Sequence, residues 1–195
     1  MTENATQRSV RHWLWRDRGN SLQNAQTFTH MYEQTYLTVF RYVYGLSAGS
    51  RQEAEDLTAE TFARAWKQRH RFTGDEQAAL GWLLRIARNL AIDASRRRKV
   101  RDEEESPSVE FLLDRSLSPE MDIIAREQIA ILWQMMGALP ARTREMLVLR
   151  YMLGWQVRQI ANYLDMNENT ISVTIRRTLK SLQVEWPYVQ EKDNE

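Results

Sequence analysis

The 195-residue sequence contains no cysteine. This absence excludes disulfide bonds, thiolate zinc sites and a cysteine nucleophile, and it agrees with a reducing compartment such as the cytoplasm. The three histidines, His12, His30 and His70, are far apart in the sequence, and neither a nucleophile–base group nor a metal-ligand spacing is present. We therefore expect a protein that is not an enzyme and that needs no metal and no cofactor.

Glycine and proline are also scarce, with 7 and 4 residues. Runs in which apolar and polar residues alternate are missing as well, so the sequence predicts an all-α fold. No apolar run approaches the length of a membrane-spanning helix, and Trp13-Leu14-Trp15 is far too short for a signal peptide. These absences predict a cytoplasmic protein without membrane insertion.

The net charge of +1 hides a segregated distribution of charge. Residues 28–101 carry a net charge of +5, residues 102–138 a net charge of −7, and residues 139–186 a net charge of +3. Two basic blocks separated by an acidic connector indicate two modules that face nucleic acid and a linker that does not bind DNA.

Composition and helical periodicity together divide the chain into five parts. These parts are a polar N-terminal extension (1–27), a helical domain (28–101), an acidic linker (102–118), a second helical domain (119–186) and a tail (187–195). The extension contains Trp13 and Trp15. It is either a mobile segment or a docking peptide for a partner, because exposed tryptophans favour protein interfaces.

Two helices are predicted at the start of the first domain. The first has an apolar stripe at helical spacing, formed by Tyr32, Tyr36, Val39, Phe40 and Val43. The second opens with a capping box of Ser50 and Glu53. Its outer face carries Asp56 and Glu60, one turn apart, but no third ligand for a metal is nearby. We therefore interpret these carboxylates as an acidic edge that faces solvent or a partner.

A third helix is predicted over 80–99, after a loop at 70–79 that contains Gly74. One face of this helix is polar and aromatic, with Trp82, Arg85, Asn89, Asp93 and Arg96, and Arg88 lies beside it. Aromatic rings and guanidinium groups next to a loop are typical of single-stranded DNA binding. Alternatively, Trp82 belongs to the core and the arginines only favour the end of the helix.

Residues 139–182 predict three helices with two tight joints, and the last two helices form a helix-turn-helix. In this motif Asn167 caps the final helix, which starts at Glu168. One face of that helix is apolar, with Ile171, Ile175, Thr178 and Leu182. The opposite side carries Asn169, Ser172, Val173, Arg176, Arg177 and Lys180. Such a face fits the major groove of DNA, although a solvated helix in an ordinary bundle would look similar.

Three segments, in this order, resemble the extracytoplasmic-function (ECF) sigma factors of bacterial RNA polymerase. They are EAEDLTAETFARAWKQRHRF, GWLLRIARNLAIDASRRRK, and LPARTREMLVLRYMLGWQVRQIANYL followed by NTISVTIRRTLKSL. The resemblance covers about residues 28–101 and 119–184. It implies two small helical domains, a sigma region 2-like bundle and a region 4-like helix-turn-helix, joined by a flexible acidic linker.

The resemblance also implies three groups of functional residues. The polymerase-binding group is Asp56, Leu57, Glu60, Thr61, Phe62 and Ala65. The group that binds the −10 promoter element is Phe72, Trp82, Arg85, Arg88, Asn89, Arg96 and Arg97, with a loop over 72–79 that captures a flipped base. The group that binds the −35 element is Asn169, Thr170, Ser172, Val173, Arg176, Arg177 and Lys180.

The implied function is to direct core RNA polymerase to specific promoters and to aid strand opening at the −10 element. The implied partners are promoter DNA, an anti-sigma factor, and core polymerase, which is contacted through the clamp coiled coil of its largest subunit and through its flap. Two features depart from the family pattern. Asp165 replaces the usual glycine of the helix-turn-helix joint, and Ser172 is one of several positions where the family often has Lys or Arg. The alternative is a stand-alone helix-turn-helix regulator that binds duplex DNA without polymerase.

Overall fold

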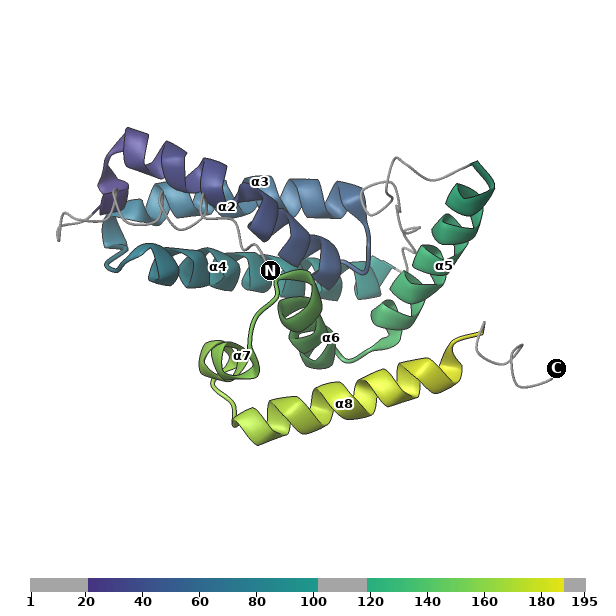
Figure 1. Cartoon of the computed structure of the whole chain (residues 1–195). Helices are drawn as coiled ribbons and strands as arrows, with labels where there is room; N and C mark the ends of the chain where they lie inside the picture. Colours follow the sequence, from purple (N-terminus) through teal and green to yellow (C-terminus); the bar gives the residue numbers. More distant parts are fainter. Residues whose placement is uncertain (1–20, 102–118, 188–195) are drawn as a thin grey trace, which may run out of the picture.

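The computed structural model describes residues 21–101 and 119–187, and within these ranges every regular element is helical (Figure 1). The elements are η1 (Ser21–Gln23), α2 (Ala25–Leu46), α3 (Arg51–Gln68), η2 (Arg69–Arg71), α4 (Glu76–Arg101), α5 (Pro119–Ala138), α6 (Ala141–Leu147), η3 (Val148–Met152), α7 (Val157–Leu164) and α8 (Glu168–Glu185). The predicted all-α class is therefore confirmed. The predictions for Trp13, Trp15 and the acidic linker lie outside the described residues.

Helices α2, α3 and α4 lie side by side and form the N-terminal bundle (Figure 1). Ser50 caps α3 as predicted, since its hydroxyl accepts a hydrogen bond from the backbone N–H of Glu53 at 3.3 Å. Val39, Phe40 and Val43 are buried, as the helical spacing predicts.

Two aromatic residues of the same stripe lie at the surface of α2. Tyr32 and Tyr36 are 40% and 37% exposed. Both rings lie against Phe62 of α3, with ring centroids 4.7 and 6.3 Å apart. The stripe is therefore buried at Val39, Phe40 and Val43 but exposed at Tyr32 and Tyr36, whose rings lie against each other and against Phe62.

Helix α4 begins at Glu76, four residues earlier than the spacing of apolar residues predicts. The reason is a cap: the Asp75 carboxylate accepts a hydrogen bond from the backbone N–H of Ala78 at 2.8 Å, which satisfies a free donor in the first turn. The apolar face of α4 contributes Leu83, Leu84 and Leu90 to the core. This packing fixes which face of α4 remains at the surface.

The C-terminal domain contains the predicted helix-turn-helix, formed by α7 and α8. Asp165 adopts the left-handed conformation after α7, with φ 53° and ψ 57°, in the position where glycine is usual. Asn167 then caps α8, its side chain accepting from the backbone N–H of Asn169 at 2.8 Å. One feature was not predicted: the helix that starts with α6 continues as the π-helical turn η3.

The two domains pack against each other and share one continuous apolar core. A Cβ atom added to Gly45 of α2 would meet Val148 of η3 at 2.5 Å, so these backbones approach closely. Trp133 of α5 lies edge-on to Tyr44, with ring centroids 5.0 Å apart. Arg144 of α6 donates to the carbonyl oxygen of Leu46 at 2.7 Å, at the C-terminal end of α2. Sequence reasoning predicted two joined domains but not this contact between them.

Candidate nucleic-acid and polymerase interfaces

Helix α8 presents a polar and basic face to solvent. Its rear side chains, Ile171 and Ile175, are buried and fix the rotation of the helix. Of the predicted −35 group, Val173 is half-buried and the others are exposed, namely Asn169, Thr170, Ser172, Arg176, Arg177 and Lys180. Helix α8 lies on the side of α6 away from the N-terminal bundle (Figure 1). The arrangement leaves this face free to enter a major groove, where amide and guanidinium groups bind base edges.

Two residues beside α8 were missed by sequence reasoning. Arg150 and Tyr151 of η3 border an open cavity of about 580 Å³ together with Ser172, Arg176 and Lys180. Arg150 is held in place by donating to the carbonyl oxygen of Trp155 at 2.9 Å, and Tyr151 is 59% exposed. No local pattern pointed to these two residues, because they directly follow the buried Val148 and Leu149 in the π-helical turn η3.

The predicted −10 face combines a hollow with a row of cationic side chains. A cavity of about 400 Å³ is bordered by Phe72 of the loop and by Trp82 and Arg85 of α4. Phe72 is buried, and its ring lies 5.1 Å from that of Trp82, which is half-buried. Trp82 is therefore partly core and partly surface, which combines the two interpretations left open by the sequence. The cavity offers an aromatic wall and a guanidinium group, which suit a base and its backbone.

The remaining −10 residues differ in their accessibility. Arg85, Asn89, Arg96 and Arg97 are exposed on α4. Arg88 is half-buried, and its Nε donates to the Glu145 carboxylate of α6 at 2.9 Å. The cavity is also bordered by Gly81 and by two side chains that were not predicted, those of Arg71 of η2 and Tyr163 of α7. Tyr163 comes from the other domain, so no local pattern in the sequence could have assigned it to this site.

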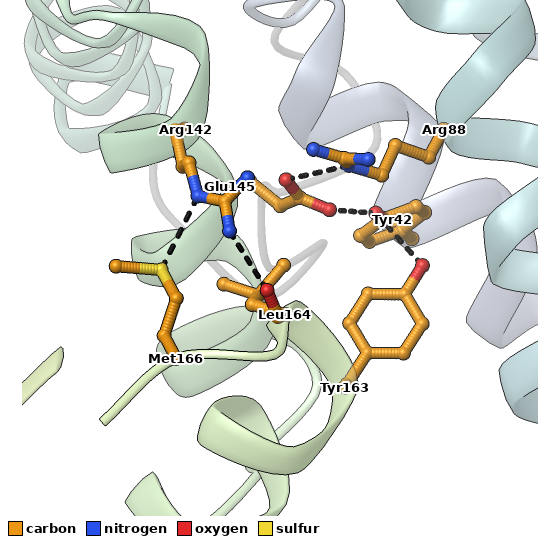
Figure 2. A network of polar contacts seen from close by, with 7 residues as sticks. All are labelled: Tyr42, Arg88, Arg142, Glu145, Tyr163, Leu164 and Met166. Atoms are coloured by element: carbon orange, nitrogen blue, oxygen red, sulfur yellow. Dashed lines mark hydrogen bonds and ion pairs between the residues drawn. The ribbon is translucent and has the colours of Figure 1, made fainter. Parts of the chain in front are cut away.

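A polar network links the two domains at the edge of the −10 face (Figure 2). The Tyr42 hydroxyl donates to Glu145 at 2.6 Å, and the hydroxyl groups of Tyr42 and Tyr163 are 3.4 Å apart. The pKa of Tyr42 is raised well above its usual value, mainly by burial and secondly by the nearby charge of Glu145. Burial also raises the pKa of Tyr163 to about 12. Burial alone would lower the pKa of Arg88, but its hydrogen bond and ion pair with Glu145 outweigh that effect and raise it.

The predicted polymerase-binding group divides into surface and core residues. Asp56 and Glu60 are exposed on α3, and Arg64 donates to the Glu60 carboxylate at 2.7 Å, which lowers the pKa of Glu60. The other four side chains are in the core: Leu57, Thr61, Phe62 and Ala65. A partner cannot contact a side chain that has no accessible surface, such as Thr61 or Ala65. These four residues therefore support the surface from behind.

No group of three or more His, Asp or Glu side chains in residues 21–101 and 119–187 is arranged to hold a metal ion. Over the same ranges, none of the helices combines the length and the apolar character needed to cross a membrane.

The geometry defines a class of protein: an all-helical DNA-binding chain with a helix-turn-helix in one domain and an aromatic, cationic hollow in the other. Comparison with protein families agrees with this class. Residues 31–101 match Sigma-70 region 2, and residues 129–182 match Sigma-70, region 4. The chain belongs to the extracytoplasmic-function family of RNA polymerase sigma factors.

Individual relatives align with most of this chain. The ECF RNA polymerase sigma factor BldN of Streptomyces coelicolor is 31% identical over 158 residues, which cover 81% of this chain and 60% of that relative. SigL of Mycobacterium tuberculosis is 26% identical over 170 residues, covering 85% of this chain and 92% of the relative. The sigma factor RpoE of Bartonella quintana, solved in complex with the anti-sigma factor NepR, has a similar fold, with a TM-score of 0.61. The two sequences are 21% identical, and the match covers 82% of this chain and 96% of that one.

Proposed function

We propose that this protein directs core RNA polymerase to specific promoters and aids strand opening at their −10 elements. Helix α8 binds the −35 element in the major groove through Asn169, Ser172 and Arg176. Helix α4 and the loop before it bind the opened −10 strand, with one base in the hollow beside Phe72 and Trp82. Extracting a base from the duplex costs a few kcal/mol, so contacts with polymerase must offset part of that free energy.

One observation carries this proposal. A single chain combines an exposed helix-turn-helix face on α8 with an aromatic, cationic hollow on α4, in the region order of sigma factors. A regulator that binds only closed duplex has no use for a hollow that accepts a base. The chemistry is binding alone, so the chain acts as an initiation factor and not as an enzyme.

The proposed partners are core polymerase, promoter DNA and an anti-sigma factor. The exposed carboxylates Asp56 and Glu60 of α3 would contact the clamp coiled coil of the largest polymerase subunit, and the C-terminal domain would contact the flap. An anti-sigma factor is proposed because RpoE of Bartonella quintana binds one. The place of action would be the cytoplasm, where polymerase and chromosome meet.

The test combines the purified chain with core polymerase from the same organism. We expect the two to co-elute in size-exclusion chromatography and to start transcripts at defined sites on genomic DNA. Trp82→Ala should reduce transcription at least about fivefold, because it removes a stacking surface worth about 1–3 kcal/mol per base, while co-elution persists. A chain that ignores polymerase but binds closed operator DNA would instead be a stand-alone helix-turn-helix regulator.

A further inference from the structure

A row of aromatic rings follows the seam between α2 and α3, which lie side by side in the N-terminal bundle (Figure 1). Tyr32 and Tyr36 of α2 lie against Phe62 of α3. Nearer the N-terminal end of α2, Phe28 lies edge-on to Trp66, with ring centroids 5.0 Å apart. These five residues form the aromatic face. Both tyrosines and the tryptophan are exposed, so the row differs from the single apolar residues of an ordinary surface.

The described chain begins beside one end of the aromatic face. Leu22 of η1 is fully buried, and the backbone carbonyl of Gln23 accepts a hydrogen bond from Arg69 Nε at 3.5 Å. The guanidinium carbon of Arg69 lies 3.6 Å from the centroid of the Trp66 ring. The position of Ser21 is therefore anchored close to Trp66, and residues 1–20 connect to the bundle at this point.

The sequence just before Ser21 has the composition of a docking segment. Residues 11–18, RHWLWRDR, contain two tryptophans and three arginines and are called the tryptophan segment below. Tryptophan and arginine are the residue types that most often carry the binding free energy of an interface. Arg69 on Trp66 already shows that the aromatic face accepts a guanidinium group.

The chain between the tryptophan segment and Ser21 is long enough to reach every ring of the face. Trp15 precedes Ser21 by six positions, and extended chain covers about 20 Å over that distance. The face itself runs from Phe28 to Tyr36, which is about 12 Å along a helix. The segment can therefore turn back at Ser21 and follow the seam.

Helix α3 offers the segment a small residue and an unpaired carboxylate next to the rings. Ala59 is exposed and lies two turns from Trp66 on the same side of α3. Asp56 is exposed one turn before Ala59, and its carboxylate has no hydrogen bond or ion pair with any residue in 21–101 or 119–187. An arginine of the tryptophan segment supplies the missing cation.

We propose that the tryptophan segment docks on the aromatic face of its own chain, with Trp13 and Trp15 against the exposed rings and an arginine at Asp56. The docked segment covers Asp56, which the proposed function assigns to polymerase. Polymerase and the segment therefore bind α3 in turn, and this consequence rests on the proposed function. The docking itself does not depend on that function.

The first experiment locates the tryptophan segment in the full chain. Because the protein has no cysteine, Val10→Cys gives a single attachment point for a benzophenone photo-crosslinker and leaves residues 11–18 unchanged. Irradiation, digestion and mass spectrometry then identify the residues that the probe reaches. We expect crosslinks within one chain to α2 and α3, with a yield that does not depend on protein concentration.

Ala59→Arg tests the face without removing a ring. Arginine adds bulk and positive charge between the rings and is a good helix former, so α3 should remain intact. Gln34→Arg is the matched control, because it adds the same side chain at an exposed position of α2. Gln34 is two positions from both Tyr32 and Tyr36 and therefore lies on another side of that helix. Circular dichroism checks that each variant remains helical.

We expect Ala59→Arg to lower the yield of these crosslinks at least about fivefold, and the double variant Trp13→Ala with Trp15→Ala to do the same. Gln34→Arg should stay within about twofold of the unmodified yield. The double variant should also assemble with core polymerase about tenfold more tightly, the gain when the undocked fraction rises from about one tenth to nearly one.

Three results would overturn the inference. Crosslinks spread over the whole chain, or equal yields in Ala59→Arg and Gln34→Arg, would show that the segment does not occupy this face. Crosslinks between two chains would assign the face to a second copy. Unchanged or weaker polymerase assembly in the double variant would show that the segment does not compete with polymerase. A chain that docks the segment but never assembles with polymerase contradicts the proposed function and leaves the docking in place.

Discussion

Arg176 and Lys180 are one turn apart on the exposed face of α8, but their side chains suit different contacts. A guanidinium group is planar and can form two parallel hydrogen bonds to a guanine edge, whereas an ammonium group acts as a point charge on a phosphate. Specificity at the −35 element is therefore expected from Arg176, and general affinity from Lys180.

Arg176→Ala should weaken promoter binding by about 1–3 kcal/mol at one or two −35 positions. The measurement is competition between duplexes that differ from the promoter at single positions. Lys180→Ala provides the comparison, since it should weaken all duplexes alike and lower the slope of log affinity against log salt by about 1. A uniform loss of binding in Arg176→Ala would assign this side chain to a phosphate.

The turn between α7 and α8 depends on a single residue in an unfavourable backbone conformation. Asp165 has φ 53°, and it follows Leu164, which is buried and ends α7. Left-handed backbone costs most L-residues roughly 1–2 kcal/mol, and Asp and Asn tolerate it better than others because their side chains can hydrogen-bond locally. The turn sets the angle between the two helices. Asp165 adopts the strained backbone conformation that this angle requires, and glycine would adopt the same conformation without strain.

Two substitutions at this position isolate the backbone contribution. Asp165→Gly and Asp165→Ala both remove the carboxylate, but only glycine adopts φ 53° without strain. The glycine variant should therefore have a free energy of unfolding about 1 kcal/mol larger than the alanine variant, measured by urea denaturation followed by circular dichroism. If the alanine variant were equally or more stable, the left-handed turn would not be present in solution.

The proposed function assigns three surfaces of the whole molecule to three partners. It assigns duplex DNA to the exposed face of α8, the opened strand to α4, and polymerase to the acidic edge of Asp56 and Glu60 on α3. Phe62, which the family resemblance places in the polymerase-binding group, is 5% exposed and belongs to the core. Phe62→Ala would cost roughly 3–5 kcal/mol of stability through a cavity, so it cannot report on assembly.

Charge reversal at the acidic edge tests the docking surface directly. Asp56→Arg and, separately, Glu60→Arg should weaken assembly with core polymerase about tenfold, equivalent to roughly 1.4 kcal/mol, because an opposite charge meets the same partner surface. Glu33→Arg is the matched control, since it makes the same change of charge at an exposed position of α2. Co-elution and affinity measurements give the result, and equal losses in all three variants would show a general effect of charge.

Local patterns in the sequence determined the secondary structure and the buried faces of most helices. Ser50 and Asn167 cap helices because their side-chain oxygens lie within reach of neighbouring N–H groups, and such contacts depend on a few adjacent residues. The buried side of α8 follows from the spacing of Ile171 and Ile175 for the same reason. The family segments and their order are also local, which is why the sigma factor class could be predicted from the sequence.

Contacts between distant residues were decided by the tertiary structure. Glu145 is an ordinary helix residue in the sequence, and only domain packing brings Tyr42, 103 positions away, within 2.6 Å of its carboxylate. Periodicity shows that Tyr32 and Tyr36 share a stripe with buried residues, but it does not show whether a neighbour covers them, and both lie at the surface. The hollow on the predicted −10 face is bordered by residues of both domains, and Tyr163 is one of them. The contact between the domains is not encoded in any sequence period, so only the three-dimensional arrangement could assign Tyr163 to the hollow.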